Sequence, residues 1–114
     1  MKILVKRVYD APAKSDGMRV LVDRLWPRGV KKTDAAIDVW AKEIAPSSAL
    51  RRWFHADPES RYKEFTRKYR KELSGQKAAG REILKAGKRI TLITAVRDID
   101  RSHIPTLVAF LAKL

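Results

Sequence analysis

Two runs of apolar, β-branched residues constrain the fold of this chain more than any other feature. The run 18–23 (MRVLVD) contains an unbroken apolar triplet, and the run 90–96 (ITLITAV) is apolar almost throughout. Strands that are apolar on both sides are typical of parallel sheets, in which both faces are covered. A third run, 3–9 (ILVKRVY), has a similar β-branched composition. We therefore expect three strands, over residues 3–9, 18–23 and 90–96.

Five other segments carry helix signals, namely apolar residues at helical spacing, N-capping residues and glycine stops. These segments span 35–44, 47–54, 58–73, 77–86 and a last stretch that Ser102 caps. Strands that alternate with helices predict a small α/β domain, spanning residues 1–114, with a mainly parallel sheet of about three strands. Three strands make a small sheet, so we expect a monomer, or a homodimer that adds strand pairing.

The composition excludes several classes of protein. The 114 residues include no cysteine, which rules out a disulfide framework, a thiolate nucleophile and a cysteine-based metal centre. Two histidines are too few to predict a dedicated metal site, so we expect no metal and no cofactor. No stretch approaches the roughly 20 apolar residues of a membrane span, and the N-terminus lacks the apolar core of a signal peptide. We therefore expect a cytoplasmic protein that does not contact membranes.

The charge of the chain points to an anionic partner. Lysine and arginine number 26 against 13 acidic residues, and the net charge is +13. The excess is uneven, because residues 51–89 hold 13 basic and 5 acidic side chains, a balance of +8. A basic excess of this size favours nucleic acid, nucleotides or phosphate as partners without choosing among them.

Polar side chains follow each predicted strand. The carboxyl ends of parallel strands meet at one edge of the sheet, where open α/β proteins bind ligands. The candidates for acid–base chemistry at this edge are Asp23, Asp98 and His103. The candidates for ligand binding are Arg7, Tyr9, Arg24, Trp26, Arg28 and Arg97. Several guanidinium groups in one pocket would suit bidentate recognition of a phosphate or carboxylate.

The same residues also have a purely structural interpretation. Asp23 and Arg97 would then form a salt bridge across neighbouring strand ends and close the sheet. Trp26 would plug the core over the sheet edge rather than stack on a ligand. His103 would only mark the start of the last helix, where free backbone N–H groups also favour an anion.

The basic segment 58–73 offers a second candidate surface. Its cationic side chains are Arg61, Lys63, Arg67, Lys68, Arg70 and Lys71. They predict either a solvated helix face, with lysine stems covering apolar surface, or a contact surface for a phosphate backbone. An accessory subunit that docks an acidic protein would carry the same charge. The sequence has no helix-turn-helix, zinc-finger or RNA-recognition signature.

Several motifs together resemble a known family. The stretches KRVYD (6–10), DGMRVLVDRLWPRGVKKTD (16–34), LRRWFH (50–55) and TLITAVRD…SHIPTL (91–107) are similar to the YeaO-like family of small bacterial domains of unknown function, domain of unknown function 488. The resemblance runs over essentially the whole chain and implies a compact α/β fold in a cytoplasmic bacterial protein. It implies no established activity, substrate or cofactor.

The family pattern covers most of the candidate residues, together with the turn residues near them. They are Arg7, Tyr9, Asp23, Arg24, Trp26, Pro27, Arg28, Gly29 and His103. One departure is Thr94, which stands where relatives often have tyrosine. If that tyrosine ring lines the pocket in relatives, this chain is expected to differ in ligand or to have lost activity.

These observations lead to one main hypothesis and one rival. The main hypothesis is binding of an anionic or phosphorylated small ligand, such as a nucleotide, at the strand ends. Whether the protein is an enzyme stays open. If it is one, we expect metal-independent acid–base or hydrolytic chemistry. Asp23 or Asp98 would be the base, because nearby arginines lower a carboxyl pKa. The rival is a regulatory protein that binds nucleic acid through the basic surface of residues 51–89.

Overall fold

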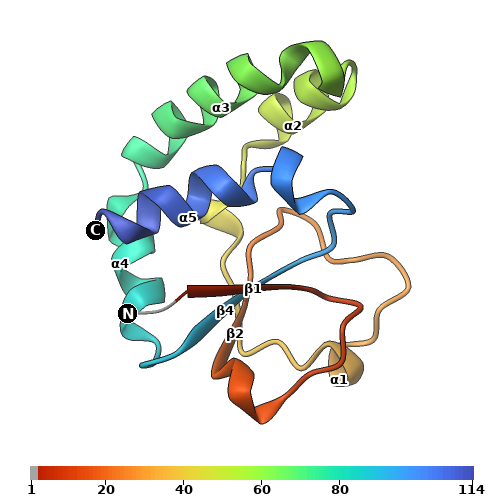
Figure 1. The fold of residues 1–114 in the computed structure, drawn as a ribbon, viewed down its shortest axis with the longest axis vertical. Coiled ribbons are helices and arrows are strands. Elements are labelled where there is room, and N and C mark those ends of the chain that lie inside the picture. Colours follow the sequence, from red (N-terminus) through yellow and green to blue (C-terminus); the bar gives the residue numbers. More distant parts are fainter. Residues whose placement is uncertain (1–2) are drawn as a thin grey trace.

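The sheet of this protein has four strands, all of them parallel. The computed structural model describes residues 3–114 (Figure 1). The strands pair in the order β1-β4-β2-β3, where β1 is Ile3–Arg7, β2 is Met18–Leu21, β3 is Val39–Trp40 and β4 is Ile90–Thr94. All three pairings are parallel. The predicted α/β class with a parallel sheet is confirmed, and the predicted number of strands is wrong by one.

The additional strand, β3, lies inside the segment 35–44 that was predicted to be a helix. Val39 pairs with Val20 and Trp40 pairs with Leu21. The helical spacing in this segment was misleading, because the side chains that it aligns divide between two faces of the sheet. Trp40 packs with the smaller apolar cluster, whereas Ala41 belongs to the larger one. The extra strand pairing therefore comes from the same chain, and the tertiary contacts override the local pattern.

Five α-helices surround the sheet, which is the predicted number, although α1 does not correspond to the helix predicted over 35–44. They are α1 (Lys32–Ala35), α2 (Ser48–His55), α3 (Pro58–Ser74), α4 (Lys77–Lys85) and α5 (Ile104–Ala112). Three short 3-10 turns, η1 (Lys14–Asp16), η2 (Lys42–Ile44) and η3 (Ile99–Arg101), complete the described elements. Within residues 3–114, no helix has the length and apolar character needed to cross a membrane.

The predicted helix starts are largely correct, because capping is a local interaction. Ser47 is the N-cap of α2, and its hydroxyl accepts the backbone N–H of Leu50 at 3.2 Å. Asp57 occupies the N-cap of α3, directly before a proline. At α5 the N-cap residue is His103, one position later than predicted, although the Ser102 hydroxyl accepts the backbone N–H of Ile104.

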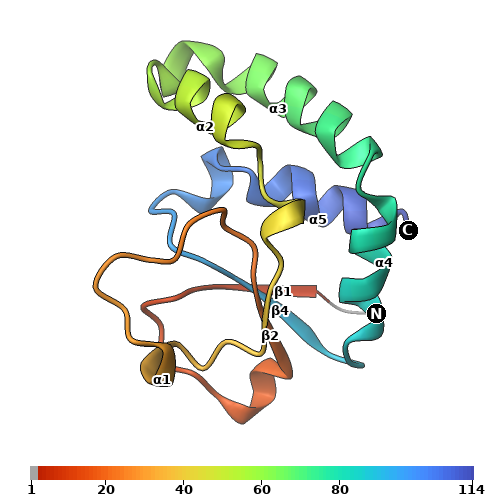
Figure 2. The same ribbon diagram turned by 180° about the vertical axis from the view of Figure 1, so that it is seen from behind.

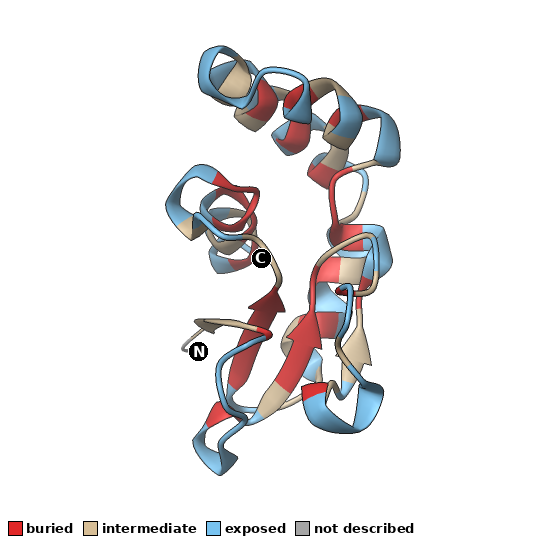
Figure 3. Cartoon of the chain, turned by 90° about the vertical axis from the view of Figure 1, so that its right-hand side faces the viewer, coloured by how far each residue is buried: buried red, intermediate tan, exposed pale blue. Residues whose placement is uncertain are grey.

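The helices α2 to α5 cover one face of the sheet, and the segment around α1 covers the other. Figures 1 and 2 show α5 between the sheet and α3, with α1 at the opposite end of the molecule. The central strands β2 and β4 are buried almost throughout, as the colours of Figure 3 show. Along each strand alternate residues enter different clusters, so Leu92 contributes to the large core while Ile93 contributes to the small one.

A buried ion network fixes the segment around α1 to the sheet. Asp16 and Arg19 are each 3% exposed, and Oδ2 of Asp16 lies 2.5 Å from Nη1 of Arg19. Lys6 adds a bond from Nζ to Oδ1 of Asp16 at 3.0 Å. The remaining guanidinium donors of Arg19 bond to the carbonyls of Ala35 and Ala36. Because every charge in this network is paired, the network can hold the end of α1 and the loop before β2 against the sheet.

Candidate functional site

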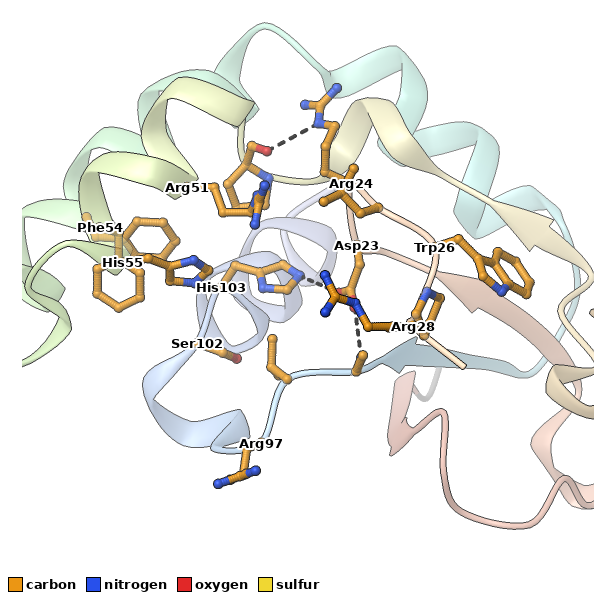
Figure 4. A pocket seen from close by; sticks show the side chains of 16 residues that line it. Asp23, Arg24, Trp26, Arg28, Arg51, Phe54, His55, Arg97, Ser102 and His103 are labelled. Atoms are coloured by element: carbon orange, nitrogen blue, oxygen red, sulfur yellow. Dashed lines mark hydrogen bonds and ion pairs between the residues drawn. The ribbon is translucent and has the colours of Figure 1, made fainter. Parts of the chain in front are cut away.

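A cavity of about 510 Å³ opens where β2 and β4 end. The segment that follows β2 and the segment that follows β4 form one side of it (Figure 4). Side chains of α2 and α3 and the residues just before α5 form the other side. The cavity therefore lies at the carboxyl edge of the parallel sheet, where open α/β proteins bind ligands.

Six of the nine residues proposed from the sequence line this cavity. They are Asp23, Arg24, Trp26, Arg28, Arg97 and His103. The other three, Arg7, Tyr9 and Asp98, are not lining residues. The parallel pairing brings the segments after β2 and β4 together, whereas β1 lies on the outer side of β4.

Asp23 is the most highly connected of the lining residues. Its Oδ1 accepts the Thr94 hydroxyl at 2.7 Å, and its Oδ2 accepts the backbone N–H of Ala95 at 2.8 Å. Nε2 of His103 lies 3.3 Å from Oδ1. The side chain thus joins the ends of two neighbouring strands to the start of α5. It contacts His103 rather than Arg97, so the salt bridge to Arg97 considered from the sequence is not formed.

These contacts determine the acidity of Asp23. Burial raises the pKa of its carboxyl, but the hydrogen bond and charge of His103, with the donors of Ala95 and Thr94, lower the pKa below its usual value. Thr94 is therefore a support for Asp23 and not a lining residue of the cavity.

The contacts of His103 define its tautomer. Its Nε2 lies 3.0 Å from the carbonyl oxygen of Val22 as well as near Asp23. A carbonyl oxygen can only accept, so Nε2 carries the hydrogen in this arrangement. The ring is 7% exposed and packs edge-on against Tyr69 at a centroid distance of 6.0 Å. His103 is therefore held in one orientation, consistent with a fixed wall of the cavity.

Among the predicted ligand-binding residues that line the cavity, Arg24 and Trp26 are engaged in structural contacts. Arg24 donates to the carbonyls of Pro46 at 3.3 Å and Ala45 at 3.0 Å, which ties the pocket rim to the start of α2. Trp26 donates to the carbonyl of Val30 at 2.7 Å and packs edge-on against Trp40 at 5.4 Å. Trp26 is thus part of the small core cluster while it also borders the cavity.

Arg28 and Arg97 are the exposed cations of the rim. Within residues 3–114, neither guanidinium forms a hydrogen bond or an ion pair with another side chain. Figure 4 shows Arg97 turned away from the other labelled residues, at the edge of the site. Arg28 follows Pro27, and the left-handed φ of 78° at Gly29 then turns the chain. Both cations are therefore available to an anion in solution.

The three predicted residues outside the cavity have other roles or exposed positions. Arg7 donates to the carbonyls of Val96 and Ala95, and so supports the segment after β4 from behind. Its guanidinium also lies 4.8 Å from the ring centroid of Tyr9, which is 55% exposed. Asp98 is exposed at the start of η3.

The sequence prediction missed the residues that α2 and α3 contribute. Arg51, Phe54 and His55 come from α2, and Phe65 comes from α3. The two phenylalanine rings stack at 4.2 Å and form an apolar wall. Partial burial, followed by the positive charges of Arg51 and His103, lowers the pKa of His55 below its usual value. The motif 50–55 contains Arg51, Phe54 and His55, but nothing in the sequence places them at the strand ends, because helix packing brings them there.

The basic face of α3 lies apart from this cavity. Arg61 donates to the carbonyl of Trp53 at 2.6 Å, and the cations of Arg61 and Lys68 both lie over the Trp53 ring. Arg67 pairs with Glu64 at 3.1 Å. Lys63, Arg70 and Lys71 remain exposed on the same helix. Half of the predicted nucleic-acid residues are thus engaged within the protein.

The donors in the described part of the chain do not suggest a metal centre. Among residues 3–114 no group of three or more histidine, aspartate or glutamate side chains is placed to hold a metal ion. The lining of the cavity combines cationic and apolar side chains with a single carboxylate, that of Asp23.

Comparisons with known proteins agree with this picture. Residues 2–114 match a family model described as "Inactive DUF488-N3 subclade". The chain is 42% identical to the uncharacterized protein YeaO of Escherichia coli over 116 residues, which cover the whole of both proteins. It is 43% identical to the uncharacterized protein Rv3073c of Mycobacterium tuberculosis, over 96% of this chain and 93% of the relative. No solved structure matches significantly. The chain therefore belongs to the YeaO-like DUF488 family and matches its inactive DUF488-N3 subclade.

Proposed function

We propose that this domain binds a small anionic ligand, with a phosphate or carboxylate group, in the cavity at the strand ends. The observation that carries the proposal is the imbalance of charge around the cavity. Arg28, Arg51 and Arg97 face or border it, whereas its single carboxylate, Asp23, is already bonded to protein donors. Guanidinium groups match the geometry of phosphate and carboxylate oxygens. Charged phosphate esters do not partition into bilayers, so such a ligand stays in the compartment where it is made. We therefore also propose a cytoplasmic location.

The proposed role is binding without turnover. A general base must reach the proton that it removes, and Asp23 instead accepts two short hydrogen bonds and contacts His103. Asp98, the other candidate base, does not line the cavity. The description of the matching family model as inactive is in keeping with this role.

Ligand-induced stabilisation tests the proposal. The full chain is melted with inorganic phosphate, pyrophosphate or citrate, each against sodium chloride at matched ionic strength. A ligand present at 100 times its Kd should add about 2.7 kcal/mol of stability. The double variant Arg28→Gln/Arg51→Met should lose this gain, whereas Arg52→Gln, an exposed change on the same helix, should keep it. A failure of every anion to stabilise the wild type would contradict the proposal.

Nucleic-acid binding is the rival function, and the exposed Lys63, Arg70 and Lys71 are what favours it. Binding through these residues should weaken steeply with salt, with a log–log slope of about −0.9 per phosphate contacted on duplex DNA. The triple variant with all three changed to glutamine should reduce both the affinity and this slope. If the wild type does not bind mixed duplexes, single-stranded DNA or RNA at low salt, this function is excluded.

A further inference from the structure

Arg51 has an unusual position in the wall of the cavity. Its Nε is buried and has no hydrogen-bond partner, and it is the only such side-chain nitrogen or oxygen identified within residues 3–114. Buried polar groups in folded proteins almost always have partners, and leaving one unpaired costs about 1–3 kcal/mol. Figure 4 shows the Arg51 side chain among the residues that line the cavity. Arg51 lines the cavity, so a turn of its side chain toward an acceptor atom of a ligand would pair this donor.

Part of the remaining wall is apolar, and the cavity is larger than an inorganic anion requires. Phe54 and Phe65 line it, and their rings stack with an interplanar angle of 22°. Leu25, at the rim, is 58% exposed and adds apolar surface to the cavity. A volume of about 510 Å³ lies within the range of sites that bind metabolite-sized molecules.

We propose that the ligand is an aromatic phosphate of about the size of a nucleoside monophosphate, with its phosphate on Arg51 and Arg28 and its ring against the apolar wall. This inference rests on the proposed function and adds the chemical class of the ligand. On binding, the Arg51 side chain turns so that its Nε donates to a phosphate oxygen, and the exposed guanidinium of Arg28 contributes charge from the rim. Leu25 and Phe54 contact the ring, so neither a bare anion nor an uncharged nucleoside occupies the whole site.

Isothermal titration calorimetry on the full chain tests this assignment. The probes are inorganic phosphate, phenyl phosphate, the four ribonucleoside monophosphates, and the matching nucleosides, at constant ionic strength. At least one aromatic phosphate should bind about tenfold or more tightly than either inorganic phosphate or its own nucleoside. If inorganic phosphate binds as tightly as every aromatic phosphate, the inference is wrong while the proposed function stands. If no probe binds, the inference is wrong, and the melts with pyrophosphate and citrate then decide whether the proposed function stands.

Substitutions at position 51 test the directed hydrogen bond. Arg51→Met should weaken binding of the tightest aromatic phosphate about 10- to 100-fold, the range expected for a hydrogen bond to a charged group. Arg51→Lys keeps the charge but removes the Nε donor and should lose most of the same affinity. Arg52→Met, with the same change of charge at the neighbouring exposed position, should bind like the wild type. Equal losses at positions 51 and 52 would show that only the overall charge matters.

The position 51 variants should remain folded, because removal of an unpaired buried donor relieves a cost rather than creating one. Arg28→Gln provides a second test at an exposed position where folding is not at risk. It should weaken aromatic phosphates and inorganic phosphate by the same factor, since Arg28 contacts only the phosphate. If Arg28→Gln leaves the affinity of every probe unchanged, the phosphate is not at this end of the cavity and the inference is overturned.

Discussion

Asp23 and His103 meet at the carboxyl edge of the sheet, with Oδ1 of the aspartate 3.3 Å from Nε2 of the histidine. The pair connects the end of β2 to the beginning of α5, and the backbone of Ala95 extends the connection to β4. One side chain therefore determines the relative position of three elements around the cavity. This pairing makes Asp23 a structural residue of the site and leaves the arginines as its available charges.

Replacement of Asp23 by asparagine is expected to destabilise the protein. An amide has only one acceptor oxygen, so its NH₂ group would face another donor, either the N–H of Ala95 or the Nε2–H of His103. Leaving such a buried donor unpaired should cost about 1–3 kcal/mol, measured by urea denaturation. Asp98→Asn, at an exposed position, is the control and should change stability by less than about 0.5 kcal/mol. Equal midpoints for the two variants would contradict the assigned role of Asp23.

The same pair predicts a specific dependence of stability on pH. The pKa of Asp23 is below its usual value of 3.8 in the folded protein, since the bonds from His103, Ala95 and Thr94 outweigh the effect of burial. A carboxyl with a lowered pKa stabilises the fold above pH 3.8, and this contribution disappears as the pH falls through the folded-state pKa. The stability difference between the wild type and Asp23→Asn should therefore shrink below pH 3.8.

Urea midpoints of both proteins, measured between about pH 6 and about pH 2.5, check this prediction. Asp16 and Asp57 also have lowered pKa values, through their own hydrogen bonds against the opposing effect of desolvation, so each protein alone will lose stability in acid. Only the difference between the two proteins reports on Asp23. A difference that stays constant over the whole range would show that the carboxylate charge contributes nothing.

Arg24 and Arg97 should respond differently to truncation, although both follow a central strand. Arg24→Ala removes the donors to the carbonyls of Pro46 and Ala45, and should cost about 1–3 kcal/mol. Arg97→Ala should change stability by less than about 0.5 kcal/mol, because the side chain is exposed. Thermal melts of both variants at low and high salt measure these losses of stability. A large loss for Arg97→Ala would mean that the Arg97 side chain forms a buried contact.

Trp40→Phe tests the strand that was not anticipated. The indole N–H of Trp40 donates to the backbone carbonyl of Asp23 at 2.8 Å, and the ring packs edge-on against Trp26. Phenylalanine keeps much of the packing but leaves the carbonyl without this donor, so we expect a loss of about 1–2 kcal/mol. Chemical denaturation followed by the fluorescence of the remaining tryptophans measures it. An almost unchanged stability would contradict the hydrogen bond from Trp40 to Asp23.

The sequence by itself determined the elements whose signals are local. The β-branched runs of β1, β2 and β4, Ser47 before α2 and Asp57-Pro58 before α3 each depend on residues a few positions apart. Propensity and capping act at this range, and so do parallel-sheet burial patterns. For the same reason the edge of the sheet that carries the cavity could be predicted, because every parallel strand ends there.

Only the tertiary structure decided which side chains meet at that edge. The strand β3 exists because the β2 backbone pairs with it, and Asp23 bonds to His103 rather than to Arg97 because α5 begins beside β2. The place of Arg51 in the cavity wall depends on how α2 packs over the strand ends. Hydrogen bonds and ion pairs act over a few ångströms, so which of them form depends on the positions of residues that are far apart in the chain.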